Sequence, residues 1–377
     1  MAGVIRPKNA SDRPSLSLYR FELSFDTATA QTISDAERNA LAFEPAFDDP
    51  LQAKVFADAC KTIELYGDAK HSGRQPGIRQ FLFDKLTAAD NSQTESLQLI
   101  DAFEAAANNG RGSVSANTFR DINQHLLAST TRDSHKGVLR TNSKQVGGGR
   151  NRPFGSELPI PDASQISALL DDLADFMNDD SVPAVVQAAL APAQLTAVHP
   201  FERGMGKTSV TMVQLAFTHR RLITGNVVFP LSLALAITAG KERRGSSETT
   251  AALLEAEPSS DVICAWIRYY AQCCTRTAEE VATFFGNVDD LKRQWLDVID
   301  VRADSAAIQI INALPGIPLF TIKGAADYID RSFKRTAVAV DELEAAGVIR
   351  QATPGKRNRV FECPQMLKAF SKIAGFQ

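Results

Sequence analysis

Cysteine is scarce in this chain, and the spacing of the few present excludes two common uses. The 377 residues include five cysteines, and no two of them form a Cys-x-x-Cys pair. An odd number of cysteines without that spacing argues against a disulfide framework and against a zinc site. We therefore expect free thiols, no bound metal and a reducing compartment, the cytoplasm.

Long apolar runs are also missing. The longest, around residues 227–239, is interrupted by Pro230 and Ser232, whereas a membrane span needs at least about eighteen apolar residues. The first residues lack the basic-then-apolar order of a secretion signal. Because 44% of the residues are hydrophobic, the chain can form one large core with one or two smaller domains. We expect no membrane contact.

The chain has little net charge, so it has no general attraction to nucleic acid. The formal net charge is −3 at pH 7. Its distribution is uneven, because residues 315–377 hold ten Lys or Arg against six Asp or Glu. That local excess makes the C-terminal residues the candidate contact for a nucleic acid.

A histidine precedes a glycine-framed turn near the middle of the chain. Residues 199–208 read His-Pro-Phe-Glu-Arg-Gly-Met-Gly-Lys-Thr, and an apolar helix is expected from about Val210 to Ile223. Such a turn presents unpaired backbone N–H groups and the positive end of the helix dipole, which favour anions such as phosphate. A P-loop would need its first glycine at the position of Phe201, so that interpretation fails.

This segment resembles the core signature of the Fic family, His-x-Phe-x-(Asp/Glu)-Gly-Asn-Gly-Arg-x-x-Arg. The residues that fit the signature in register are His199, Pro200, Phe201, Gly204 and Gly206. The residues that depart from it are Arg203 at the acidic metal-ligand position, Met205 at the asparagine, Lys207 at the first arginine and Val210 at the second. The resemblance implies a mainly helical Fic-type bundle with a small β-hairpin flap.

The resemblance also implies a chemistry, protein adenylylation. His199 would act as general base on the hydroxyl of a target protein, or of the chain itself, which attacks the α-phosphate of ATP. The alternative role for this histidine is a structural one, as a cap of the turn. The expected phosphate-binding residues are Gly204, Met205, Gly206 and Lys207.

The departures put that chemistry in doubt. A guanidinium at Arg203 would repel the Mg²⁺ that an acidic residue holds there, and Glu202 points about 100° away on a helical turn. Lys207 is a point charge without the fork of arginine. Three outcomes stay open: metal-independent binding of a phosphate compound, altered transfer chemistry, or loss of catalysis with binding retained. We expect loss or strong attenuation of AMP transfer.

Two further segments follow from the resemblance. The flap corresponds to residues 137–161, where Lys144, Gln145 and Val146 would pair with the backbone of a target peptide. Many Fic proteins also carry an inhibitory glutamate that pairs with the second motif arginine. Glu95 lies near that place, but Val210 offers it no partner, so we expect an ordinary solvated residue.

Helical spacing of apolar residues dominates from Asp35 onward, after an expected strand at Leu16–Phe25. The expected domains are an N-terminal accessory region (1–90), a Fic-like core (91–285) with the motif at 199–210, a helical connector (286–314) and a C-terminal unit (315–377).

The order of elements in the C-terminal unit predicts a winged helix-turn-helix. A helix at Ile322–Ile329 is followed by a turn, a second helix at Phe333–Ala346, and two strands around a basic turn. The residues expected to meet base edges are Ser332, Lys334, Arg335 and Thr336, and those expected to meet phosphates are Lys356, Arg357 and Arg359. The alternative is a protein-contact or dimer module, since Asp341, Glu342 and Glu344 lie on the same helix.

Two functional hypotheses therefore remain. The first is a cytoplasmic Fic-like protein, descended from a protein adenylyltransferase, with weakened ATP chemistry and a DNA-binding C-terminal domain. The second is a transcriptional regulator without enzymatic activity, in which the Fic-like core senses a ligand or forms a homodimer.

Overall fold

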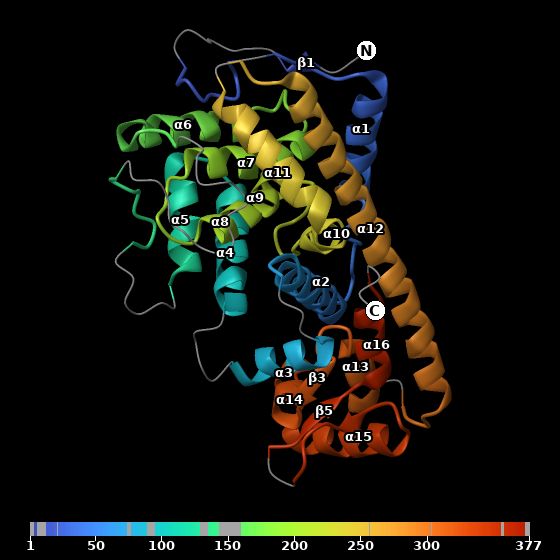
Figure 1. Ribbon diagram of the computed structural model, residues 1–377. Helices are drawn as coiled ribbons and strands as arrows, with labels where there is room; N and C mark the ends of the chain where they lie inside the picture. The colour runs from blue at the N-terminus through green and yellow to red at the C-terminus, as the bar shows by residue number, and fades with distance from the viewer. Residues whose placement is uncertain are drawn as a thin grey trace.

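The structure is a computed structural model. It describes residues 4–5, 13–20, 22–73, 77–88, 95–128, 135–142, 160–255, 257–302, 304–355 and 358–373. Figure 1 shows a helical core at one end, a small unit with a three-stranded sheet at the other, and one long helix running beside both. The expected mainly helical fold class is confirmed.

The first helices and strands build the core and the surface around it. In chain order they are β1 (Val4–Ile5), β2 (Leu23–Ser24), α1 (Thr27–Leu41), α2 (Pro50–His71), α3 (Ile78–Ala88), α4 (Glu95–Gly110), α5 (Ala116–Leu126), η2 (Ala163–Gln165), α6 (Ile166–Met177), α7 (Ala184–Val198), α8 (Met205–Val210), α9 (Met212–His219), α10 (Ser232–Ile237), α11 (Ala239–Leu254) and α12 (Ser260–Asp297).

Helix α7 is the centre of this core. All of its residues except Pro192 and Thr196 are buried, and α6, α8, α9, α11 and α12 pack around it. Alanine at many positions lets neighbouring helices approach from every side, as expected for a helix that is apolar all round. The end of α7 is thereby held firmly, and the segment expected to carry the chemistry begins there.

Two expected elements differ from the structure. The strand expected at Leu16–Phe25 is wrong except for β2, because successive side chains around Ser17 and Tyr19 are buried instead of alternate ones, and the Ser17 hydroxyl donates to Asp172 (2.7 Å). The helix expected from about Val210 to Ile223 is present as the shorter α9, and α8 precedes it within the expected glycine turn. The Thr211 hydroxyl donates to the Thr208 carbonyl where the two helices meet (2.7 Å).

The C-terminal elements form a separate layer around the sheet. They are α13 (Ala306–Ala313), β3 (Leu319–Thr321), α14 (Ile322–Tyr328), α15 (Phe333–Ala345), β4 (Arg350–Gln351), β5 (Val360–Glu362) and α16 (Pro364–Lys372). The sheet order is β3-β5-β4 and both pairings are antiparallel. Gly347, at a φ of 74°, follows α15 where a helix stop was expected.

The C-terminal unit packs on α3 and on α2, which lie between it and the core in Figure 1. The carboxylate of Glu362 is almost fully buried and pairs with Arg79 of α3 (2.5 Å) and with Arg350 of β4 (2.7 Å). Tyr328 of α14 donates to Asp58 of α2 (2.8 Å). Helix α12 is continuous through the domain boundary expected at residue 285. No helix in the described ranges is long and apolar enough to cross a membrane.

Candidate functional site

His199 marks the end of α7 and the point at which the chain reverses. Its backbone is left-handed (φ 47°, ψ 59°), and its N–H donates to the carbonyl of Leu195 (2.9 Å). This conformation is costly for a residue other than glycine and persists only where neighbouring contacts impose it. We call residues 199–204 the motif loop.

A buried arginine imposes that conformation. Arg140 is 4% exposed, and its guanidinium donates to the carbonyls of His199 (2.7 Å), Asn142 (2.9 Å) and Pro161 (2.6 Å). Its backbone N–H donates to the carbonyl of Pro200 (2.9 Å). Arg140 therefore fastens the motif loop to both described ends of the segment expected to be the flap. The sequence places Arg140 at the start of the expected flap, but the sequence interpretation gave it no role in the site.

The same arginine affects the titration of the catalytic candidate. Burial of the His199 imidazole, together with the positive charge of Arg140, lowers its pKa to about 4. Both influences disfavour the imidazolium. At neutral pH the ring is therefore uncharged, which is the protonation state that a general base needs, although the low pKa also makes it a weak base.

Gly204 begins α8, and only glycine fits there. Its φ is 75°, and a Cβ at this position would lie 2.9 Å from a methyl carbon of Leu126. Its carbonyl accepts the N–H of Thr208 (2.8 Å), the first turn of α8. Gly206, by contrast, has open space at the place of a Cβ. The expected glycine turn is present, with its open side at Gly206.

Asn123 of α5 joins three parts of the site. It is fully buried, and its amide donates to the carbonyl of Arg203 (2.9 Å) and to the Thr208 hydroxyl (3.1 Å). Its side-chain oxygen accepts the N–H of Gly137 (3.0 Å). The sequence interpretation also missed this residue, since a single asparagine within a helix gives no pattern.

Two buried apolar side chains anchor the motif loop and α8 to the core. Phe201 is fully buried and forms an isolated antiparallel bridge with Leu139. Met205 is 9% exposed, so its thioether side chain lies with the core. At the position where the resemblance expects asparagine, the chain thus has a core residue.

Lys207 does not point its charge toward the open side of the turn. Its ammonium forms an ion pair with Asp68 of α2 and donates to the Ser72 hydroxyl (3.3 Å). Asp68 is 4% exposed, so this pair is largely shielded from water. A nearby carboxylate offsets much of the attraction that Lys207 would exert on a phosphate. The expected phosphate-binding role of this lysine therefore has a competitor within the chain.

Further ionisable groups connect α2 with α10 and α11. Glu64 of α2 is buried, and its carboxylate accepts the N–H (2.9 Å) and hydroxyl (2.6 Å) of Ser232. Burial raises the pKa of Glu64 to about 7, against the lowering effect of those two hydrogen bonds. His71 approaches Glu242 of α11 at 2.9 Å. The site thus rests on a polar layer that links α2, α10 and α11.

The two remaining charged residues of the motif loop lie on its outer side. Arg203 and Glu202 are exposed, and Glu202 pairs with His135 at 3.2 Å. No group of three or more His, Cys, Asp or Glu in the part of the chain that the structure describes is placed to hold a metal. At the position where the resemblance expects an acidic metal ligand, the side chain is the cation of Arg203, which repels a divalent cation.

The residues expected to contact DNA fall into three groups. Lys334 and Arg335 are exposed on α15, and Ser332 caps that helix by accepting the N–H of Arg335 (3.4 Å). Thr336 is fully buried, and its hydroxyl donates to the Ser332 carbonyl (3.1 Å). The structure thus contradicts a base contact by Thr336, because the first turn of α15 directs this side chain inward.

Of the residues expected at the basic turn, Arg359 is described: it lies over the Phe361 ring (5.1 Å) and 3.7 Å from Asp341. Outside the described residues lie Lys356 and Arg357 of the basic turn, Lys144, Gln145 and Val146 of the flap, and the side chain of Glu95.

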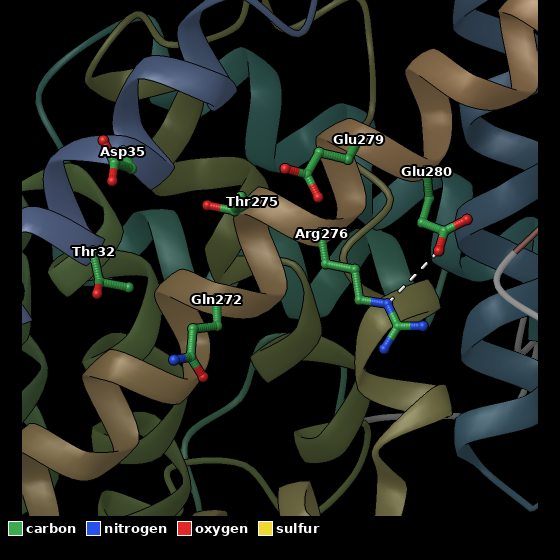
Figure 2. A pocket seen from close by; sticks show the side chains of 7 residues that line it. All are labelled: Thr32, Asp35, Gln272, Thr275, Arg276, Glu279 and Glu280. Carbon is green, nitrogen blue, oxygen red and sulfur yellow. Dashed lines mark ion pairs between the residues drawn. The ribbon is translucent and has the colours of Figure 1, made fainter.

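An open groove of about 540 Å³ lies between α1 and α12, away from the motif loop; Figure 2 shows it, with Arg276 paired with Glu280 at 3.7 Å. It is lined by Thr32, Asp35, Gln272, Thr275, Arg276, Glu279 and Glu280. None of the expected site residues borders this groove, so it is not the candidate site.

Comparison with known proteins gives a family for the part of the chain around the motif loop. Residues 113–217 match the model of the Fic/DOC family. No curated protein matches the chain. A solved Fic family protein from Desulfovibrio desulfuricans G20 is similar with a TM-score of 0.53 and 11% identity, over 90% of this chain and 96% of that one.

A second solved structure, Fic-1 (residues 134–508) from C. elegans, is similar with a TM-score of 0.50 and 15% identity, over 69% of this chain and 73% of that one. At these identities the two likenesses concern the fold. Together with the family match, they place a Fic/DOC family domain at residues 113–217.

Proposed function

We propose that the Fic/DOC family domain at residues 113–217 is a group-transfer domain with attenuated AMP transfer. The observation that carries this proposal is His199: an uncharged imidazole with a pKa of about 4, fixed beside an open glycine turn. In the proposed reaction, His199 takes the proton of a target hydroxyl. The hydroxyl oxygen then bonds to the α-phosphorus of ATP, and the bond to pyrophosphate breaks.

Attenuation follows from the charges around the turn. Lys207 is held by Asp68, so less positive charge is available to a triphosphate. Arg203 stands where the family has a carboxylate, and its positive charge would repel Mg²⁺. Transition-state charge on the phosphates therefore has less stabilisation than in a site with metal and two arginines. We propose slow transfer, or binding of a phosphate compound without turnover.

We further infer that residues 306–373 form a winged helix. The order α13, β3, α14, α15, β4, β5, with the sheet arranged β3-β5-β4, supports this assignment. DNA binding by this unit remains a prediction from the sequence. The exposed Lys334 and Arg335 favour it, whereas the burial of Thr336 and the ion pair between Arg359 and Asp341 weigh against it.

Incubation with α-labelled ATP and Mg²⁺ or Mn²⁺ tests the transfer proposal. Labelling of the protein itself or of an added target is expected, at a low rate, and should disappear in His199→Ala. The matched control is His135→Ala, which removes an exposed imidazole that contacts Glu202 of the same loop and should leave labelling unchanged.

The same samples distinguish the transfer proposal from the rival hypothesis, a regulator without transfer activity. The transfer proposal would be ruled out if no common nucleoside triphosphate labelled the protein and none raised its melting temperature. A rise in melting temperature without label would instead show a binding site that has lost its chemistry.

A further inference from the structure

One face of α15 is uncovered, although the rest of the helix is packed. Thr336, Ala339, Val340 and Leu343 are buried on its inner side, where α13 and α14 contact it. On its outer side Lys334, Arg335, Val338, Asp341 and Glu342 are exposed, as is the small Ala345 at the last turn. Figure 1 shows α15 at the end of the molecule farthest from the core. We call the residues Lys334, Arg335, Val338, Asp341 and Glu342 the outer face of α15.

The charges of the outer face are arranged symmetrically about Val338, its one large apolar side chain. Val338, which is 54% exposed, is preceded by two cations three and four residues earlier and followed by two anions three and four residues later. At about 100° per residue, these four side chains lie within roughly 60° of the direction of Val338. The face therefore has a basic half, an apolar centre and an acidic half.

We propose that the outer face of α15 is a homodimer interface, in which two copies pair antiparallel about a two-fold axis beside Val338. Such a face is complementary to itself, since a two-fold rotation brings the basic half of one helix onto the acidic half of the other.

The helical geometry also specifies the partners. The two helices meet along a line through the Val338 side chains. On one side of this line Asp341 lies beside Lys334 of the second copy, and on the other side Glu342 lies beside Arg335 of the second copy. Each such pair is offset by about 1.5 Å along the axis, one residue of helix rise. The two Val338 side chains meet at the centre and lose water-exposed apolar surface.

The strength expected of this contact is modest. One helix face buries less area than a standard protein interface, and exposed ion pairs contribute little each. Asp341 also has an internal partner in Arg359, at 3.7 Å and exposed, which the second copy must compete with. We expect a dimer that forms at high protein concentration and weakens as salt is added.

The competing occupant of this face is DNA. A groove-bound helix would place Asp341 and Glu342 near phosphates, which repel carboxylates. A second copy places cations opposite them instead. The acidic half therefore favours a protein partner, and duplex DNA is the alternative that the experiment must be able to detect.

Two charge-reversed variants of the full chain test the proposal. Lys334→Glu/Arg335→Glu makes the outer face wholly acidic, and Asp341→Lys/Glu342→Lys makes it wholly basic. Both place the new charges at the helix end that the dipole favours, so α15 should stay folded. Sedimentation velocity over a concentration series reports the mass of each.

The expected result is a shift of the wild type from 40.9 kDa toward twice that mass, with each variant monomeric alone. An equimolar mixture of the two variants should recover the dimer, because their faces are complementary. Lys323→Glu, an exposed reversal on α14, is the control and should dimerise like the wild type.

Three results would overturn the proposal: a monomeric wild type at all concentrations, variants that still dimerise alone, or a mixture that stays monomeric. A labelled DNA duplex added to the same samples detects the alternative. If the basic variant binds duplex more tightly than the wild type while no sample dimerises, the face is a nucleic-acid contact instead. These results are independent of the transfer activity, whose test depends on His199.

Discussion

At the scale of single residues, the site depends on two buried polar side chains that hold backbone groups. Arg140 and Asn123 each contact three or more groups of the motif loop and the segment around it. A buried polar group left without a partner costs on the order of 1–3 kcal/mol. These two residues therefore hold the loop that carries His199 in position.

Replacing Arg140 tests that role. Arg140→Met should lower the free energy of unfolding by roughly 2–4 kcal/mol, because several buried carbonyls lose their donor. It should also raise the pKa of His199 above about 4, since a nearby positive charge is removed. Urea unfolding measures the first effect and an NMR titration of the imidazole the second. Arg111→Met, an exposed arginine, is the control, and equal losses in both variants would contradict the account.

Glu64 predicts a dependence of stability on pH. Its pKa is raised by burial to about 7 in the folded protein, well above the value near 4.3 in an unfolded chain. Between these two values the folded state holds a proton that the unfolded state has lost, so stability is present at low pH and falls as pH rises through 7.

Glu64→Gln should remove that fall. Its amide can still accept the N–H of Ser232 and donate to the hydroxyl, so the packing is kept. We expect a higher melting temperature than the wild type at pH 8 and a similar one at pH 5. Parallel melting curves of the two proteins across this range would contradict the assignment.

At the scale of elements, α2 connects the site with the rest of the molecule. It contributes Asp68 to Lys207 and crosses α10 so closely that a Cβ on Gly67 would lie 2.6 Å from the backbone nitrogen of Leu233. Only glycine permits this approach. The crossing fixes the distance between α2 and the helices around the motif loop.

The close crossing predicts opposite outcomes for two glycines. Gly67→Ala should destabilise the fold by about 1–3 kcal/mol, because overpacking forces the two helices apart. Gly286→Ala, in α12, has open space around the new methyl group and should stabilise by about 0.5–1 kcal/mol, as expected for alanine in a helix. Chemical unfolding compares the two, and a neutral Gly67→Ala would show that α10 can move.

The ion pair between α2 and α8 gives a prediction for binding. Asp68→Asn keeps the shape of the side chain but removes its charge, so the positive charge of Lys207 becomes available to a phosphate. We expect tighter nucleotide binding by calorimetry than in the wild type. Asp84→Asn, on the exposed side of α3, should change nothing, and equal affinities in all three proteins would argue against a phosphate site at Lys207.

At the scale of the whole molecule, local patterns were readable from the sequence and long-range contacts were not. The motif loop, the turn at Gly204 and the order of helices and strands in the C-terminal unit each depend on residues close together in the chain. Glycine turns and helical periodicity are visible there, whereas the alternating pattern at Leu16–Phe25 was misleading.

The contacts that decide the chemistry join distant residues. Arg140 and His199 are 59 positions apart, and Lys207 and Asp68 are 139 apart. No periodicity links such pairs, because the fold alone brings them together. For the same reason Thr336 was expected to face outward, although the packing of α15 on α13 and α14 directs it into the core.

The central claim is that the charges around the turn, and not the position of His199, limit transfer. The most direct measurement is the rate of label transfer from α-labelled ATP with Mg²⁺ in the wild type and in Arg203→Asp, which restores a carboxylate beside the motif histidine. The account predicts that Arg203→Asp accelerates transfer by at least about tenfold, roughly 1.4 kcal/mol of barrier, and that His199→Ala added to it abolishes the gain. A rate in Arg203→Asp no higher than in the wild type, or a gain that survives the loss of His199, would contradict it.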